Sequence, residues 1–131
     1  MKARRLSVAS TKTDFPERIT SIIMLLNLGI KEDNLKMRDH DKEELSHYSN
    51  STTDIEFKFP FGFKEVEGIH SRTDFDLSAH QELSGKKLQY FDPETNKSFV
   101  PFVVETSIGV DRMFLQIMAA SYKEEETFVL G

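Results

Sequence analysis

The segment Phe102–Leu115, with the sequence F-V-V-E-T-S-I-G-V-D-R-M-F-L, constrains the fold more than any other part of the chain. Its first half favours a β-strand that runs through Ser107, Gly109 favours a turn, and the apolar periodicity that follows favours a helix. Side chains alternate along a strand, so Glu105 and Ser107 are expected on one face of it. The segment therefore predicts a strand, a tight turn and a helix, with two polar side chains aligned before the turn.

Arg112 falls in the first turn of the expected helix, where the helix dipole disfavours a cation. An anion such as a nucleotide phosphate would compensate for that unfavourable position. A surface ion pair of Arg112 with Asp111 or Glu105 remains an alternative, and Ser107 could simply cap the helix. These alternatives are left open by the residues alone.

A second block spans Phe59–Leu77, with the sequence F-P-F-G-F-K-E-V-E-G-I-H-S-R-T-D-F-D-L, and is followed by His80. Alternation places Glu65 and Glu67 on one face of a strand, so either carboxylate could point into a cleft. Gly68 is expected at a bend or a close backbone approach.

These two blocks resemble a class II aminoacyl-tRNA synthetase of the glycyl type. The segment 102–115 is similar to motif 3 in its E-x-S-x-G-x-D-R form, and the second block to the pattern E-x-E-G-I-x-x-R-x-D-[FY]-D-L-x-x-H. They are joined by Ser84–Lys87 and Tyr90–Asp92, as in the homodimeric bacterial enzymes. The resemblance runs from about Leu28 to about Tyr122.

The resemblance implies an α+β fold, an antiparallel sheet flanked by helices, as part of a class II catalytic domain. That domain would occupy 14–123, with motif 3 at 105–115, after a disordered leader at 1–13 and before a tail at 124–131. Motif 1, the F-R-x-E signature of motif 2 and the anticodon-binding domain have no counterpart in this sequence. The chain is therefore expected to be the C-terminal part of a catalytic domain, inactive by itself.

For the glycine substrate, the resemblance implies that Glu105 holds the ammonium group and that Ser107 also binds glycine. A carboxylate and an ammonium form charge-assisted hydrogen bonds, which fits this role. Of the two glutamates in the second block, Glu65 is preferred as a glycine contact. Arg72 matches an arginine near the amino-acid pocket, but a structural salt bridge to Asp74 or Asp76 is an equally good interpretation.

For the nucleotide, the resemblance makes Arg112 the catalytic motif 3 arginine, in contact with the adenine face and the γ-phosphate of ATP. A planar guanidinium suits both stacking and phosphate binding. Gly109 would allow the chain to approach the nucleotide closely. Two positions depart from the family pattern: Thr106 stands where many relatives have Pro, and His70 where many have Ala.

The function implied for the parent protein is that of a glycine–tRNA ligase. Glycine and ATP, with Mg²⁺ implied by the family, would form glycyl-adenylate, and the glycyl group would pass to tRNA(Gly). The parent would be a homodimer. Two other classes stay open: a non-catalytic remnant that binds a small amino acid or a nucleotide, and a purely structural or assembly piece of a larger chain.

Composition limits the remaining possibilities. The 131 residues contain no cysteine, which excludes disulfides and cysteine-based zinc sites, and the four histidines lack metal-ligand spacing. A net charge of −5 argues against a surface built mainly for phosphate backbones, so a tRNA partner follows from the resemblance alone. The longest apolar run, 22–26, is too short for a membrane span, and no secretory signal is evident. Cytoplasmic localisation is the default expectation.

Periodicity also predicts the order of elements. Helices are expected from Asp14 to about Gly29, over 42–48 with Asp41 as its cap, over 74–83, and after Gly109. Extended segments are expected at 35–38, 53–59 (half-buried), 64–70, 88–91 and 98–107. The expected buried faces are Ile19, Ile22, Ile23 and Leu26 in the first helix, and Phe114, Ile117, Met118 and Ser121 in the last.

Overall fold

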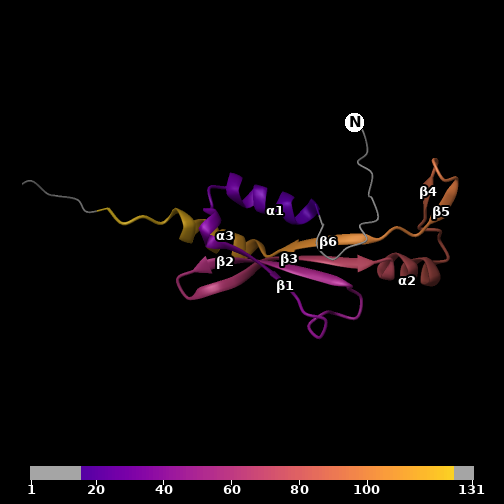
Figure 1. Cartoon of the computed structure of the whole chain (residues 1–131), viewed down its shortest axis with the longest axis horizontal. Helices are drawn as coiled ribbons and strands as arrows, with labels where there is room; N and C mark the ends of the chain where they lie inside the picture. Colours follow the sequence, from indigo (N-terminus) through magenta and orange to yellow (C-terminus); the bar gives the residue numbers. More distant parts are fainter. Residues whose placement is uncertain (1–15, 126–131) are drawn as a thin grey trace, which may run out of the picture.

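A computed structural model describes residues 16–125 and contains a four-stranded antiparallel sheet in the order β1-β2-β3-β6 (Figure 1). Its strands are β1 Leu35–Asp39, β2 Ser51–Phe59, β3 Gly62–Thr73 and β6 Val103–Ile108. The other elements are helices α1 Pro16–Asn27, α2 Phe75–Ser84 and α3 Val110–Ser121, a 3₁₀ turn at Glu32–Asn34, and a separate hairpin of β4 Tyr90–Asp92 and β5 Lys97–Phe99. The expected α+β class with an antiparallel sheet is confirmed. The expected leader at 1–13 and most of the tail lie outside the described residues.

The strand register divides the sheet into two faces, because directly paired residues of antiparallel strands point the same way. On one face, which we call the helix-covered face, Ile55 pairs with Glu67 and Thr53 with Ile69. The opposite face, the polar face, carries two rows of paired residues that run across β2, β3 and β6. These rows are Thr52, His70 and Glu105, and then Asp54, Gly68 and Ser107.

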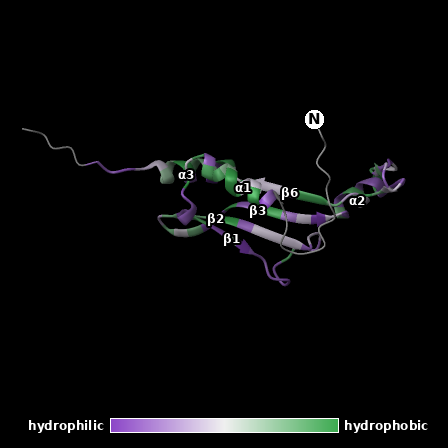
Figure 2. Ribbon diagram, turned by 45° about the horizontal axis from the view of Figure 1, so that its top comes forward, coloured by the Kyte–Doolittle hydropathy of each residue, from purple (hydrophilic) through white to green (hydrophobic). Residues whose placement is uncertain are grey.

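The hydrophobic core lies between the helix-covered face and helices α1 and α3, which Figure 2 shows on the same side of the sheet. Half-buried Ala119 and Ala120 of α3 pack against this core. Complete burial of one large apolar side chain, such as Leu25 or Phe57, contributes about 1.5–3 kcal/mol to stability. This layer is therefore the main source of stability. The buried hydrophobic residues are Leu25, Ile30, Ile55, Phe57, Phe59, Val66 and Ile69.

Helix α1 is present as expected and ends before Gly29, whose φ of +86° is in the left-handed region. The predicted buried face was right only for Ile22, which is half-buried and packs against the core. Leu25 is fully buried and Ser21 nearly so, whereas Ile19 is 65% and Ile23 51% exposed. The apolar run in this helix is almost continuous, so its periodicity could not select one face. The orientation of the helix is instead fixed by packing and by the hydrogen bond that Ser21 donates to Glu67 of β3.

Helix α3 differs from expectation in the same way. Phe114, Met118 and Ser121, expected on the buried face, are exposed, Ile117 is half-buried, and Gln116 is fully buried. The small side chains of Ala119 and Ala120 face the core and allow the helix to lie close to the sheet. Gln116 and the two alanines, rather than the large apolar residues Phe114 and Met118, therefore mark the buried side of α3.

Residues 42–48 form turns instead of the predicted helix, although the Glu44 N–H does donate to the carbonyl of Asp41 at 3.0 Å. The side chain of Glu44 forms an ion pair with Arg38 of β1 at 2.5 Å. The segment 40–50 covers part of the polar face, where Ser49 Oγ lies 3.2 Å from Thr52 Oγ1. Because β2 is covered on both faces here, it is more buried than the half-buried strand that alternation predicts.

The strand expected over 98–107 is divided into β5 and β6, which belong to different sheets. Pro101, which cannot donate a ladder hydrogen bond, lies in the gap. Helix α2 forms as expected, between Asp74 and Gly85, which has a φ of +66°. Within residues 16–125, no helix is long and apolar enough to cross a membrane.

Candidate functional site

The site predicted around residues 105–112 lies where β6 ends and α3 begins. The expected strand, turn and helix are confirmed, with Gly109 in extended conformation between them. The Gly109 N–H donates to the carbonyl of Val66 at 3.4 Å, which ties the turn to β3. A Cβ added at Gly109 would meet Arg112 side-chain atoms at 3.6 Å, an ordinary contact, so the fold itself does not require glycine here.

Arg72 is the centre of an ion-pair cluster on the polar face. Its Nη1 donates to Glu105 Oε2 at 2.6 Å, while Nε and Nη2 donate to the two Asp76 carboxylate oxygens at 2.5 and 3.0 Å. Its guanidinium carbon also lies 4.1 Å from the ring centroid of Tyr48. The structural salt bridge to Asp76 is therefore present. Asp74 instead accepts from the hydroxyl of Ser78 at 3.3 Å.

A β-bulge and a helix bring this cluster together. Ser71 and Thr73 pair with neighbouring residues of β6, so Arg72 is an extra residue in β3 and its side chain is re-aimed. Thr73 has a φ of +55°, which is rare for a β-branched residue, and the chain there turns into α2, the helix that carries Asp76.

The electrostatics of the cluster follow from these contacts. The Arg72 guanidinium donates to Asp76 and lowers the pKa of that carboxyl group below its usual value, an effect that desolvation partly opposes. Conversely, the hydrogen bond to Asp76 raises the pKa of Arg72, with a further contribution from Glu105. Arg72 therefore stays charged and holds Glu105 in place.

Ser107 lies on the polar face with Glu105, as alternation predicts. It pairs with Gly68 across β3 and is exposed. Glu105 pairs with His70 in the next row, and its side chain is 40% exposed. A small molecule that approached the polar face could therefore contact both the carboxylate and the hydroxyl.

Arg112 contacts neither Asp111 nor Glu105. Its Nη1 donates to the backbone carbonyl of Glu65 at 2.9 Å and lies 3.8 Å from the Glu65 carboxylate. The Arg112 side chain is 59% exposed. The structure therefore places Glu65 beside Arg112, further along β3 from the Arg72–Glu105 pair.

The prediction that Glu65 and Glu67 share a face was wrong. Glu67 pairs with Ile55 and Glu65 with the next residue, Glu56, so Val66 is an extra residue in β3 and reverses the alternation. Glu65 lies on the polar face, whereas Glu67 is buried on the helix-covered face and accepts from Ser21 Oγ at 2.7 Å. Burial raises the pKa of Glu67, and the Ser21 hydrogen bond opposes that rise only in part.

Sequence reasoning missed several polar-face residues next to these groups. His40 Nε2 lies 2.6 Å from Asp54 Oδ2, and Thr52 Oγ1 lies 3.1 Å from His70 Nδ1. Alternation along 51–59 places Thr52 and Asp54 on one face, and that signal could have found them. Tyr48 had no comparable signal, because its position depends on the turns of 41–50. Among residues 16–125, no three His, Asp or Glu side chains gather as metal ligands do.

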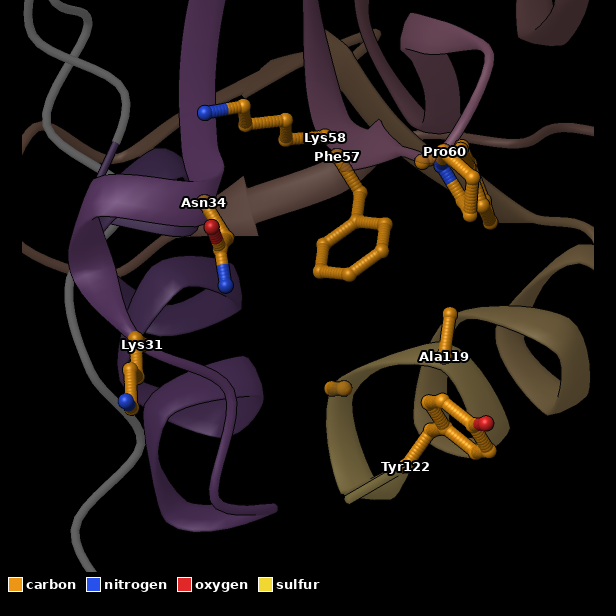
Figure 3. A pocket seen from close by; sticks show the side chains of 9 residues that line it. Lys31, Asn34, Phe57, Lys58, Pro60, Ala119 and Tyr122 are labelled. Carbon is orange, nitrogen blue, oxygen red and sulfur yellow. The ribbon is translucent and has the colours of Figure 1, made fainter. Parts of the chain in front are cut away.

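A cavity of about 510 Å³ lies elsewhere, near the end of β2 and the C-terminal end of α3 (Figure 3). None of the predicted site residues lines it. Its walls are formed by Lys31, Asn34, Phe57, Lys58, Phe59, Pro60, Ala119, Ala120 and Tyr122. The candidate site is therefore an open surface of the sheet and not this cavity.

No family model matches the chain. Curated relatives do match: the glycine–tRNA ligase of Geobacillus kaustophilus is 58% identical over 102 residues, or 78% of this chain. Those of Macrococcus caseolyticus and Acetivibrio thermocellus are each 58% identical, over 101 and 102 residues. The chain spans about a fifth of the length of these relatives, 22% in each case.

Proposed function

The chain is homologous to a segment of glycine–tRNA ligases, and from that premise we propose that the whole protein activates glycine with ATP and transfers it to tRNA(Gly). The supporting observation is the Arg72–Glu105 ion pair, set beside Ser107 on an open polar face. This segment would supply one part of the active site. The remainder would come from regions of the relatives that the chain does not span.

Glycine would bind to Glu105 and Ser107. Arg72 occupies Oε2 of Glu105, so the other oxygen can accept hydrogen bonds from the substrate ammonium. Because Arg72 is itself fixed by Asp76, the carboxylate is oriented before the substrate arrives, which lowers the entropic cost of binding. Arg72 thus serves as a positioning residue at the amino-acid pocket.

ATP would bind at the other end of β3, against Arg112 and Gly109. Arg112 is exposed in the first turn of α3, where an anion would stabilise its charge. Gly109 has room for a side chain within the fold, so its lack of one is better explained by a ligand that approaches the turn. Glu65 lies beside Arg112 at this end of β3 and remains a proposed substrate contact.

Mg²⁺ would accompany the nucleotide and balance the charge on its phosphates. This ion usually binds through one or two carboxylates together with substrate phosphates, so a dedicated group of protein ligands is not required. The residues of this chain would bind and orient glycine and ATP, so that the glycine carboxylate meets the α-phosphate. Positioning and charge stabilisation are the main contributions of proteins to such transfers.

Glycine-dependent exchange of pyrophosphate into ATP by the complete protein tests this proposal. We expect exchange with glycine and much less with alanine or serine. Binding of glycine or ATP without any exchange would point instead to a non-catalytic remnant. If neither ligand bound, the segment would be a structural piece and the proposal would be wrong.

A further inference from the structure

The ring of Tyr48 lies against the Arg72 guanidinium, although it comes from the turns between β1 and β2. The guanidinium carbon is 4.1 Å from the centroid of this ring. The Arg72 side chain is 22% exposed, and Tyr48 is half-buried. A guanidinium within about 6 Å of an aromatic centroid is attracted to the ring face, more strongly where water is excluded. The contact therefore stabilises the charge of Arg72 and partly shields it from water.

The ring restrains Arg72 in a direction that its ion pairs leave free. The N–H bonds of a guanidinium lie in its plane, and they donate here to Glu105 and to Asp76. These hydrogen bonds fix the position of the group within the plane. Tyr48 instead resists movement out of the plane, because it lies against the face of the group. Both restraints together keep Nη1 aimed at Glu105 Oε2.

The turns that carry Tyr48 are tied to β3 directly beside Arg72. The carbonyl of Ser71 accepts from the Asn50 N–H at 3.0 Å and from Ser49 Oγ at 3.1 Å. Ser71 precedes Arg72, the extra residue of the β-bulge. The position of Tyr48 over the guanidinium is therefore set by backbone contacts as well as by its own ring.

Tyr48 also belongs to an aromatic cluster at the start of α2. Its ring lies 6.3 Å from that of Phe75, and His47 packs edge-on against Tyr48 and Phe75 at 5.2 and 5.4 Å. Phe75 is the first residue of α2 and directly precedes Asp76. The same ring thus contacts Arg72 and the helix that carries the partner of Arg72.

We propose that Tyr48 is a positioning residue for glycine binding, whose ring holds the Arg72 guanidinium where it orients Glu105 toward the substrate ammonium. This inference rests on the proposed function. Tyr48 acts through Arg72, so it should affect the amino-acid part of the site and leave the nucleotide part, at Arg112, unaffected. The turns between β1 and β2 thereby become part of the amino-acid site.

Removing the aromatic face should weaken the binding of a glycyl ligand. Tyr48→Leu keeps an apolar side chain but loses the face, and a cation–π contact changes an equilibrium by about 2- to 30-fold. We expect glycyl affinity to fall about fivefold and ATP affinity to change by less than about twofold. Tyr48→Phe keeps the face and should bind both ligands as the unmodified protein does.

His47→Leu is the matched control. It changes a ring of the same cluster that lies against Tyr48 and Phe75 and not against the guanidinium. All three variants should fold, because the turns keep their hydrogen bonds to Ser71. Thermal unfolding of each variant would verify this.

The test measures Kd by calorimetry for glycyl-sulfamoyl adenosine, a non-hydrolysable adenylate analogue, and for ATP, with the complete protein that contains this chain. Weaker binding of the analogue in Tyr48→Leu alone, with ATP binding retained, supports the proposal. An unchanged Kd for the analogue, or an equal loss for ATP, overturns it and leaves the proposed function intact. The same loss in Tyr48→Phe or His47→Leu also overturns it, because the aromatic face against Arg72 would not be the cause.

A second arm tests whether Tyr48 acts through Arg72. In an Arg72→Gln background, the further change Tyr48→Leu should weaken the analogue no more, because residues that act through one contact are not additive. A further loss of about fivefold in that background would mean that Tyr48 acts by another route, and the proposal would be wrong. If neither ligand binds the unmodified protein, the proposed function fails, and this inference fails with it.

Discussion

Arg72 donates from Nη1 to Glu105 Oε2 at 2.6 Å, from one strand of the sheet to the next. The other two nitrogens of the same guanidinium donate to the Asp76 carboxylate, and the face of the guanidinium lies over the ring of Tyr48. The proposed ammonium-binding carboxylate is thus oriented by a cation that is itself held from three sides. A flexible surface glutamate would lose more rotamer entropy on binding a substrate.

The first prediction concerns glycine binding. Glu105→Ala in the complete protein should raise the glycine concentration needed for half-maximal activation by thirtyfold or more, because losing one partner of a desolvated charge pair costs about 2–5 kcal/mol. Steady-state pyrophosphate exchange at varied glycine and varied ATP measures this. Glu82→Ala, on the exposed side of α2, is the control. Equal changes in glycine and ATP dependence would remove the assigned role of Glu105.

Arg112→Lys tests the nucleotide site. The substitution keeps the charge but loses the planar surface and the forked donors, so ATP use should weaken strongly while glycine dependence changes little. The control is Arg38→Lys, which alters an arginine that pairs with Glu44 and Asp54 and with none of the residues proposed to bind ATP. A melting temperature lowered by many degrees with unchanged ATP dependence would show instead that Arg112 only stabilises the fold, through its contact with Glu65.

A third prediction is that the 131-residue chain alone does not activate glycine at a measurable rate. The sequence lacks the F-R-x-E signature of motif 2, and the loss of one preorganised charge-stabilising group commonly costs about 10²–10³-fold in rate. Purified chain should show no glycine-dependent pyrophosphate exchange above a blank, whereas the complete protein should. Exchange by the chain alone would contradict this expectation.

The buried carboxyl group of Glu67 predicts a pH dependence of stability. Its pKa is raised in the folded state above the ordinary value of 4.5, so the folded state binds the proton more tightly than the unfolded state does. The resulting contribution to the free energy of unfolding is full below about pH 4.5 and is lost as pH rises through the folded-state pKa. Glu67→Gln, which stays neutral, should flatten this decline and stabilise the chain at neutral pH.

Urea unfolding of the unmodified chain and of Glu67→Gln between pH 4 and pH 8 would measure this difference. Glu82→Gln, at an exposed position on α2, serves as the control and should leave the decline in place. Parallel curves for the unmodified chain and Glu67→Gln would mean that folding does not raise the pKa of Glu67.

The parts of the site that could be predicted from sequence are local ones. The strand, the turn at Gly109 and the first turn of α3 follow from neighbouring residues, and so does the shared face of Glu105 and Ser107. The glutamates of β3 could not be placed in the same way. The extra residue Val66 reverses the alternation of side chains along β3, and no residue type in that strand indicates a bulge at this position.

Contacts between distant segments were also beyond prediction. Arg72 and Glu105 are separated by α2 and a hairpin, and the choice between a structural salt bridge and the amino-acid pocket could not be made from spacing. The structure supplies the bond to Asp76 together with the one to Glu105. Likewise, the burial of Ser21 and Gln116 follows from tertiary packing, which overrides a periodicity that favoured larger apolar residues.

The pairing of β3 with β6 also determines which changes of length the chain can tolerate during evolution. The connection 74–102, with α2 and the hairpin, joins the two strands but does not set their register, so segments can be inserted there while Arg72 and Glu105 still meet. One residue inserted before Glu105 within β6 would turn the carboxylate away from Arg72 and present its neighbour instead. Homologous sequences should therefore vary in length in the connection and keep the length of the two strands.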